Sequence, residues 1–170
     1  MLEIYTAGFL DADGSVSLYR DRSNQPNYLR APCVEFYNCD KGILEKIQTR
    51  WGGRIGAKKS AKETHNISYE LRLIGNAAYK LLEDVAPHML HTKKSNRARL
   101  IVEHYKTCTP RNGKYTPDQI EKKKWLVEEV MGIIMRGTGA YECAVAGPEL
   151  GSIGAIKIEV DSPAKARLTQ

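Results

Sequence analysis

The fold of this chain is best predicted from one stretch near its start, Thr6-Ala7-Gly8-Phe9-Leu10-Asp11-Ala12-Asp13-Gly14-Ser15. The segment from Leu2 to Asp11 predicts a short helix in which small residues stand among larger apolar ones. The turn-forming letters Asp11-Ala12-Asp13-Gly14 are expected to end this helix and to lead into the next element. Two carboxylates are therefore expected together at a helix end.

Small side chains on the predicted helix favour close contact with a second helix. Gly8 and Ala12 are four residues apart and share one helical face, where short side chains let two backbones approach. Phe9 and Leu10 are expected to face the core of their own domain. A carboxylate just past a helix C-terminus lies beside the negative end of the helix dipole, so the place favours a cation. If a second copy brought its carboxylate there, a divalent metal would relieve the repulsion.

Periodic patterns follow the first helix in a regular order. Val16, Leu18, Val34 and Phe36 alternate with polar residues and are expected to face the core. The expected elements are a strand at 15–22, a polar loop at 21–27, a strand at 29–38, a helix at 41–51 with Asp40 as its N-cap and Gly52-Gly53 behind it, a hairpin of strands at 54–59 and 66–74, and a helix capped by Asn76 that ends before Pro87. This order indicates an α+β domain.

The second half of the chain predicts two further helices and a weakly patterned end. A helix is expected at 95–106, and the letters Thr116-Pro117-Asp118-Gln119 predict a capping box that starts a helix running to about Met135. From Gly137 onward glycines are frequent, and only 156–160 alternates like a strand. We therefore expect one domain over residues 1–136 and a C-terminal extension over 137–170, either flexible or a short strand.

Composition and charge limit the classes of function. The 170 residues are 42% hydrophobic and 27% charged, which excludes disordered and fibrous classes. We expect neither a membrane span nor a secretory leader, because no apolar stretch is long enough. The net charge is +6, with 11 basic and 6 acidic residues over 15–74, and 10 basic and 3 acidic over 91–124. Basic charge gathered in two segments makes a polyanion a plausible partner.

The four cysteines, Cys33, Cys39, Cys108 and Cys143, form no C-x-x-C pair. Free thiols predict a reducing intracellular compartment, either an organelle (chloroplast or mitochondrion) or a prokaryotic cytoplasm. The spacing of the histidines and cysteines around 88–108 matches no structural zinc pattern, so these residues are expected to be ordinary core and surface side chains.

The opening stretch resembles the signature of the LAGLIDADG homing endonucleases. It departs from the name-giving letters at Thr6, Phe9 and Leu10 and keeps Ala-Gly, two apolar residues and Asp-Ala-Asp-Gly. The element order over about 2–86 is also that of the family. The resemblance implies an αββαββα fold with a curved, antiparallel, four-stranded DNA-binding sheet, to which this chain adds C-terminal helices.

The resemblance also implies a metal site and a dimer interface. In the family the second acidic residue of the signature binds catalytic Mg²⁺, and here that residue is Asp13, with the backbone carbonyl of Ala12 beside it. Mn²⁺ could replace Mg²⁺, and Ca²⁺ would be a non-cleaving substitute. Asp11 matches the first acidic position, which belongs to the helix interface with Ala7, Gly8 and Ala12. The plain alternative is that Asp11 and Asp13 cap a helix-to-strand turn.

Further site residues are carried over by position. Asn38 falls where the family has a polar residue that positions water, or else it is a turn asparagine. A family lysine that approaches the scissile phosphate corresponds to Lys93 or Lys94, and a solvated helix start is the alternative. Lys41 is the nearest candidate for a further basic residue, at a shorter spacing than in some members.

The sheet is expected to present one face to the major groove of DNA. Alternation places on that face the candidate base-contacting residues Ser17, Tyr19, Ala31, Cys33, Glu35, Arg54, Lys58, Ser68, Glu70 and Arg72. Loop ends carry the candidate phosphate contacts Arg20, Arg22, Arg30 and Lys59. Each of these charges could equally be an ordinary solvated one.

Only one signature is present in the chain, and family members with one copy work as homodimers. The resemblance implies a metal-dependent, site-specific endonuclease that makes a double-strand break at a long, partly palindromic target. Two alternatives share the fold. One is an intron maturase that binds its host intron RNA, for which Lys122-Lys123-Lys124 would offer a basic surface. The other is a DNA-binding protein that does not cleave.

Overall fold

The computed structural model describes residues 1–20, 25–58, 67–110 and 113–133, and the following account refers to these ranges. The elements run in the order α1 (Leu2–Asp13), β1 (Ser15–Tyr19), β2 (Ala31–Asn38), α2 (Lys41–Trp51), β3 (Arg54–Lys58), β4 (Ser68–Ile74), α3 (Asn76–Val85), the 3-10 turn η1 (Ala86–His88), α4 (Thr92–His104) and α5 (Pro117–Gly132). The predicted α+β order from α1 to α3 is confirmed, and so are the additional helices.

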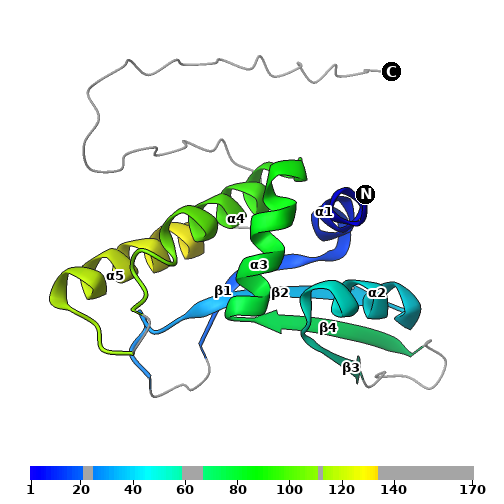
Figure 1. Cartoon of the computed structure of the whole chain (residues 1–170), viewed down its shortest axis with the longest axis horizontal. Coiled ribbons are helices and arrows are strands. Elements are labelled where there is room, and N and C mark those ends of the chain that lie inside the picture. Colours follow the sequence, from blue (N-terminus) through cyan, green and yellow to red (C-terminus); the bar gives the residue numbers. More distant parts are fainter. Residues whose placement is uncertain (21–24, 59–66, 111–112, 134–170) are drawn as a thin grey trace, which may run out of the picture. The chain divides into compact units, whose positions relative to one another are not determined.

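The four strands form one antiparallel sheet in the order β1-β2-β4-β3, with the helices gathered on one face of it (Figure 1). Val16, Leu18, Val34 and Phe36 point to the helix side and are at most 2% exposed, as alternation predicts. The opposite face carries the odd-numbered residues of β1 and β2. One face of the sheet therefore builds the core, and the other is left for a ligand.

The first helix extends two residues farther than predicted, because Asp11 and Asp13 both lie within α1. Gly14 then turns the chain into β1, and its N–H donates to the carbonyl of Leu10 at 3.2 Å. A Cβ on Gly14 would lie 2.9 Å from the Leu10 Cα and 3.1 Å from the Glu35 carbonyl oxygen. Position 14 therefore requires glycine because there is no room for a side chain, while its backbone angles are ones that any residue adopts.

Several predicted boundaries are also corrected. The cap of α3 is Gly75, at φ 65°, and Asn76 is the first helical residue; the Gly75 N–H donates to the carbonyl of Pro32 at 2.8 Å, where β4 ends beside β2. Helix α4 begins at Thr92 and so includes both candidate lysines. The predicted N-cap Asp40 and the Thr116–Gln119 capping box are confirmed. The predicted end at Met135 and the extension 137–170 lie outside the described residues.

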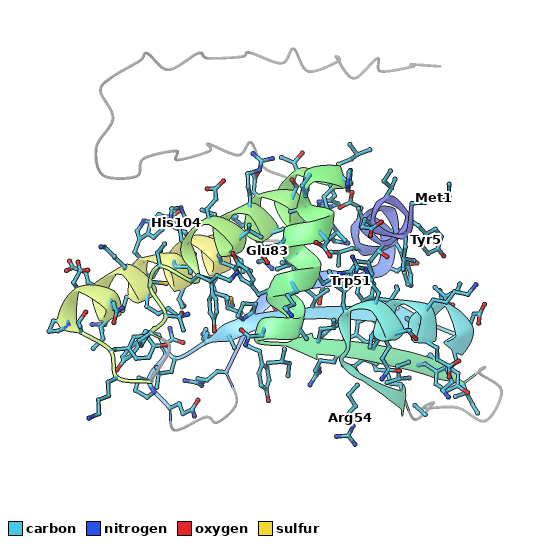
Figure 2. All side chains as sticks on the ribbon, in the orientation of Figure 1. Met1, Tyr5, Trp51, Arg54, Glu83 and His104 are labelled. Atoms are coloured by element: carbon cyan, nitrogen blue, oxygen red, sulfur yellow. The ribbon has the colours of Figure 1, made fainter. Side chains whose placement is uncertain are left out.

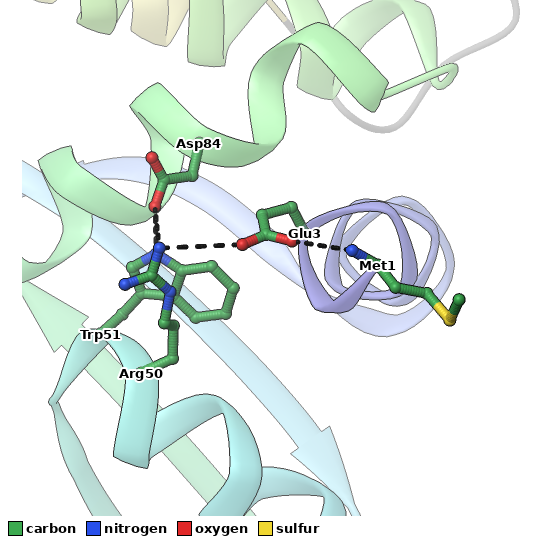
Figure 3. Close-up of polar contacts among 5 residues, drawn as sticks. All are labelled: Met1, Glu3, Arg50, Trp51 and Asp84. Atoms are coloured by element: carbon green, nitrogen blue, oxygen red, sulfur yellow. Dashed lines mark hydrogen bonds and ion pairs between the residues drawn. The ribbon is translucent and has the colours of Figure 1, made fainter.

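A group of charged side chains ties the start of α1 to α2 and α3 (Figure 3). Arg50 lies 3.7 Å from the carboxylate of Glu3 and 3.9 Å from that of Asp84, while the Trp51 indole N–H donates to Asp84 at 2.7 Å. The ion pairs are exposed and contribute little energy. The buried Leu10 and Ala7 pack α1 into the hydrophobic core.

Lys123 is buried in the contact between α4 and α5, which corrects the expectation that all three lysines at 122–124 belong to a basic surface. Its side chain is 0% exposed, its ammonium donates to the Thr109 hydroxyl at 2.7 Å, and it lies 3.6 Å from the centre of the Tyr105 ring. Lys122 is paired with Asp118 at 3.0 Å. Of the three lysines, Lys122 and Lys124 are therefore the ones that remain at the surface of this helix.

The stability of the protein is expected to depend on the charge of Lys123. Burial lowers its pKa to about 8, from an ordinary value near 10.5. Below pH 8 the folded state bears the full cost of a buried ammonium. As the pH rises from about 8 to 10.5, the folded protein carries a neutral amine while the unfolded chain is still protonated, so the free energy of unfolding increases.

Lys123→Met is expected to raise the free energy of unfolding at pH 7 by about 2 kcal/mol, because methionine fills the same space without the cost of a buried charge. Its advantage should shrink as the pH approaches 10. Denaturant unfolding at pH 7 and pH 10 measures both values, with the exposed Lys124→Met as the control. A loss of stability at pH 7 would contradict the prediction, because it would show that the contacts of the ammonium outweigh the cost of burying it.

No helix in the described part of the chain is both long and apolar enough to cross a bilayer.

Candidate metal and nucleic-acid site

Asp13 is the last residue of α1 and is exposed. The C-terminus of a helix carries unpaired carbonyls and the negative end of the dipole, so a carboxylate in this place needs positive charge nearby. The chain supplies one such charge in Lys94, whose ammonium lies under the last turn of α1. The exposed carboxylate of Asp13 remains on the outer side of this helix end.

Lys94 is 7% exposed and is bound to the backbone of α1. Its ammonium donates to the carbonyl oxygens of Leu10 at 3.0 Å, Asp11 at 2.7 Å and Ala12 at 3.3 Å. Burial lowers the pKa of Lys94, although the carboxylates of Asp11 and Asp13 favour its charged form. Because its donors are taken up inside the protein, Lys94 is not placed as the lysine that approaches a phosphate. Lys93, half-buried on the first turn of α4, keeps that prediction.

Asp11 is engaged within its own chain, and its place in a dimer interface stays a prediction. Its Oδ2 accepts hydrogen bonds from the backbone N–H groups of Leu90 at 2.6 Å and His91 at 3.1 Å, just before α4 begins. Ala7 is corrected as an interface residue, because it is 0% exposed and packs into the core of the domain. Of the four predicted interface residues, only Gly8 and Ala12 are exposed.

An apolar stripe on the outer side of α1 extends this exposed face. Met1, Ile4 and Tyr5 are 100%, 60% and 52% exposed, and a Cβ on Gly8 would meet nothing within 4 Å. Met1 and Tyr5 project from the side of α1 that is turned away from the other helices (Figure 2). A helix with an uncovered apolar side and small residues along it is suited to packing against another helix.

The donor set fits a metal only in part within one chain. Asp13 offers a carboxylate, a ligand that Mg²⁺ and Ca²⁺ prefer. Ala12 offers its carbonyl, but that oxygen also accepts from Lys94. Within the described ranges no three His, Cys, Asp or Glu side chains come together as a metal-binding group. A complete site would therefore need ligands from outside the chain, such as a second Asp13 and a phosphate oxygen.

Asn38 lies at the end of β2, and its side chain forms a turn. Its Oδ1 accepts from the N–H of Asp40 at 2.8 Å, and Asp40 in turn caps α2. The strand register places Asn38 three residues past the Ser15–Glu35 pair, or about 10 Å along the strand, on the side where α1 ends. The turn interpretation of Asn38 is thus present in the structure. Lys41 is paired with Glu45 at 2.8 Å.

The open face of the sheet contains the predicted base-contacting residues in defined rows. The rows across the strands are Tyr19 with Ala31; Ser17 with Cys33 and Ile74; Ser15 with Glu35, Arg72 and Arg54; Tyr37 with Glu70 and Gly56; and Ser68 with Lys58. Arg54 points away from the helices in Figure 2. The shared face predicted from alternation is therefore confirmed.

The centre of this face is a polar network around Glu35. The carboxylate of Glu35 accepts from the Ser15 hydroxyl at 3.2 Å and the Tyr37 hydroxyl at 3.0 Å, and it pairs with Arg72 at 2.8 Å. Arg72 also pairs with Glu70 at 2.9 Å. Burial and the bond to Glu35 raise the pKa of Tyr37 to about 12. Sequence reasoning missed Tyr37, although the same alternation, continued by one step, would have found it.

Other predicted DNA contacts are less accessible than expected. Cys33 faces outward but is 1% exposed, so it is corrected as a base contact. Arg30 donates to Asn27 and to the Leu18 carbonyl, and Arg20 donates to the Gln25 carbonyl, so both are engaged within the chain. Arg22 and Lys59 lie outside the described residues. The accessible basic residues of the face are therefore Arg54, Lys58 and Arg72.

Comparison with known proteins identifies the fold. No model of a protein family matches the sequence, and no curated protein matches it by sequence. The homing endonuclease I-CvuI, bound to its target in the presence of calcium, matches with a TM-score of 0.59 and 19% identity over 82% of this chain and 85% of that chain. The archaeal intron-encoded homing endonuclease I-Vdi141I, complexed with DNA, matches with a TM-score of 0.51 and 19% identity over 82% of this chain and 88% of its own.

A third structure matches a smaller part of its own chain. The LAGLIDADG homing endonuclease I-GzeII, in complex with a DNA target, has a TM-score of 0.50 and 17% identity over 77% of this chain and 43% of its own. In this chain the LAGLIDADG-like stretch forms most of α1 and the glycine that leads into β1. The chain therefore has the fold of the LAGLIDADG homing endonucleases.

Proposed function

We propose that this chain is a LAGLIDADG homing endonuclease, a site-specific DNA endonuclease that hydrolyses phosphodiester bonds in both strands of a long, partly palindromic target as a homodimer. The observation that carries the proposal is the position of Asp13. Its exposed carboxylate ends α1 beside the first strand of a sheet whose open face bears accessible arginine and lysine. A DNA strand lying on that face would bring a phosphate near this carboxylate.

The homodimer is supported by the single signature and by the uncovered face of α1. One chain supplies one exposed signature carboxylate, while cleavage of two strands needs two. The chain spans 85% of I-CvuI but only 43% of I-GzeII, so it is about half as long as the second protein. The stripe of Met1, Ile4, Tyr5, Gly8 and Ala12 offers the surface on which a second α1 would pack.

Different residues of each subunit would bind the metal, contact the phosphate and position water. Asp13, with the Ala12 carbonyl as a weaker ligand, would hold a divalent cation, either Mg²⁺ or Mn²⁺, with Ca²⁺ as a non-cleaving substitute. When bound, the cation supplies charge neutralisation at the phosphate and lowers the pKa of water. Lys93 would contact the scissile phosphate, and the amide of Asn38 would orient water. The structure of I-CvuI with its target contains DNA in the presence of calcium, which supports the choice of a divalent cation.

The sheet face would contact bases in the major groove. Arg54 and Arg72 are directly opposite each other in the register of β3 and β4, and arginine is suited to binding a guanine edge in the major groove. Glu35 and Glu70 hold Arg72 in place, so its direction is set before DNA binds. Pre-arranged contacts of this kind lower the entropy lost on binding.

Cleavage of a DNA library tests the proposal. The protein should be incubated in Mg²⁺ with duplexes that join the DNA flanking its reading frame, and with a library of partly palindromic duplexes, followed by sequencing of the ends. We expect breaks in both strands at one site. Binding to a selected site without any break in Mg²⁺ or Mn²⁺ would indicate a DNA-binding protein that does not cleave, and would contradict the proposal.

A further inference from the structure

The ends of α1 and α4 are joined by two charged side chains. Asp11, in the last turn of α1, accepts from the N–H groups of Leu90 and His91, which precede α4. Lys94, in the first turn of α4, donates to the carbonyls of the last turn of α1. We call this pair of contacts the α1–α4 junction. The two partners are 83 residues apart in the sequence.

Each charge in the junction has the sign that its helix end favours. A helix N-terminus has unpaired N–H groups and positive potential, and a C-terminus has unpaired carbonyls and negative potential. The carboxylate therefore binds the two residues that lead into α4, where His91 caps the helix by accepting from the Lys94 N–H, and the ammonium caps the end of α1. Lys94 is buried and has three carbonyl acceptors between 2.7 and 3.3 Å, which satisfies the capacity of an ammonium to donate.

We infer that Lys94 is a positioning residue, which fixes the last turn of α1 and so sets the direction of the Asp13 carboxylate, with Asp11 as the second half of the same junction. For the reaction, this inference rests on the proposed function. The junction itself is a property of the free chain. Lys93 would then be the lysine that contacts DNA, and Lys94 would contact none.

If Lys94 were only a counter-charge for the helix end, its removal would have a different effect on cleavage. If Lys94 only neutralised the helix end, its removal would leave more negative charge beside Asp13 and would strengthen metal binding without loss of rate. If Lys94 positions Asp13, its removal lets the last turn of α1 move, and the rate falls even at saturating metal. Misplacement of a catalytic group by about 1 Å can cost about 100-fold in rate.

The first test measures cleavage by Lys94→Met as a function of Mg²⁺ concentration. We expect the rate at saturating Mg²⁺ to fall at least about tenfold, while affinity for target DNA in Ca²⁺ changes less than about threefold. Asp11→Ala should have a similar effect, and the double variant should lose little more than either single variant, because both act on one junction. The exposed Lys124→Met is the matched control. A rate equal to wild type for Lys94→Met, or fully additive losses, would overturn the inference.

The second test needs neither DNA nor metal. Amide hydrogen exchange by NMR should show faster exchange at Leu90 and His91 in Asp11→Ala, which removes their acceptor. The inference requires faster exchange at the same two amides in Lys94→Met, although Lys94 gives them no bond. If these two amides exchange at the wild-type rate in Lys94→Met, the Asp11 and Lys94 contacts are independent of each other, and the inference is wrong. If the junction holds but the wild-type protein cuts no DNA, the proposed function fails alone.

Discussion

Asp13→Asn is expected to retain sequence-specific DNA binding and to lose cleavage by about 1,000-fold or more. Asparagine has the same shape but no charge, so it would bind a divalent cation far more weakly. Loss of several kcal/mol of charge stabilisation at the phosphate corresponds to about three factors of ten in rate. Because Asp13 lies at the negative end of α1, its neutralisation should not weaken the fold.

The measurement is a single-turnover cleavage assay paired with a DNA-binding assay in Ca²⁺. Asp118→Asn is a matched control, since Asp118 is an exposed carboxylate in the first turn of α5 and should leave cleavage unchanged. Cleavage by Asp13→Asn at the wild-type rate would rule out Asp13 as the metal ligand. Loss of both binding and cleavage would mean that Asp13 acts in DNA recognition and not in the chemistry.

Gly8→Gln is expected to convert the homodimer to a monomer and to remove double-strand cleavage. In a single chain the new side chain meets nothing, because a Cβ on Gly8 has no neighbour within 4 Å. Replacing glycine inside a helix should even stabilise α1 by about 0.5–1 kcal/mol. A long side chain between two closely packed helices would separate them, so the effect falls on the assembly and not on the fold.

Light scattering coupled to size-exclusion chromatography measures the assembly, and thermal unfolding measures the fold. Gly132→Gln, at the end of α5, is the matched control, because it makes the same replacement at a helical glycine with open space around it. We expect that control to remain a dimer and to cut both strands. A dimeric, active Gly8→Gln variant would show that the chains associate through a surface other than α1.

Local patterns were sufficient for the sheet and its two faces. Alternation along β1 and β2 correctly separates Val16, Val34 and Phe36 from Ser17 and Glu35, because side chains on a strand alternate strictly between the two sides. The same rule placed Cys33 on the open face. It could not show that longer neighbours cover the thiol, because exposure depends on side chains from adjacent strands. Cys33 was therefore wrong as a contact although its direction was right.

Charged residues were the least predictable part of the chain. Lys123 stands between two other lysines and has the pattern of a solvated helix face, but the packing of α5 on α4 turns it toward Tyr105 and Thr109. Asp11 and Lys94 have no local feature that separates them from Asp13 and Lys93. Their roles depend on which helix end lies nearby. A periodic pattern along the sequence indicates contacts between neighbouring residues only, and not between distant segments.

The sequence alone was enough to predict the order of helices and strands, the presence of carboxylates at the end of the first helix, and which residues share the open face of the sheet. These features depend on short-range rules of helix ends, strand alternation and turn residues. The resemblance had already given the metal to Asp13 and the helix interface to Asp11. Only the folded chain separated the two lysines and showed what Asp11 binds, because burial and helix-end electrostatics depend on how α1 meets α4. That contact assigns Asp11 and Lys94 to the junction and leaves Asp13 exposed to a ligand.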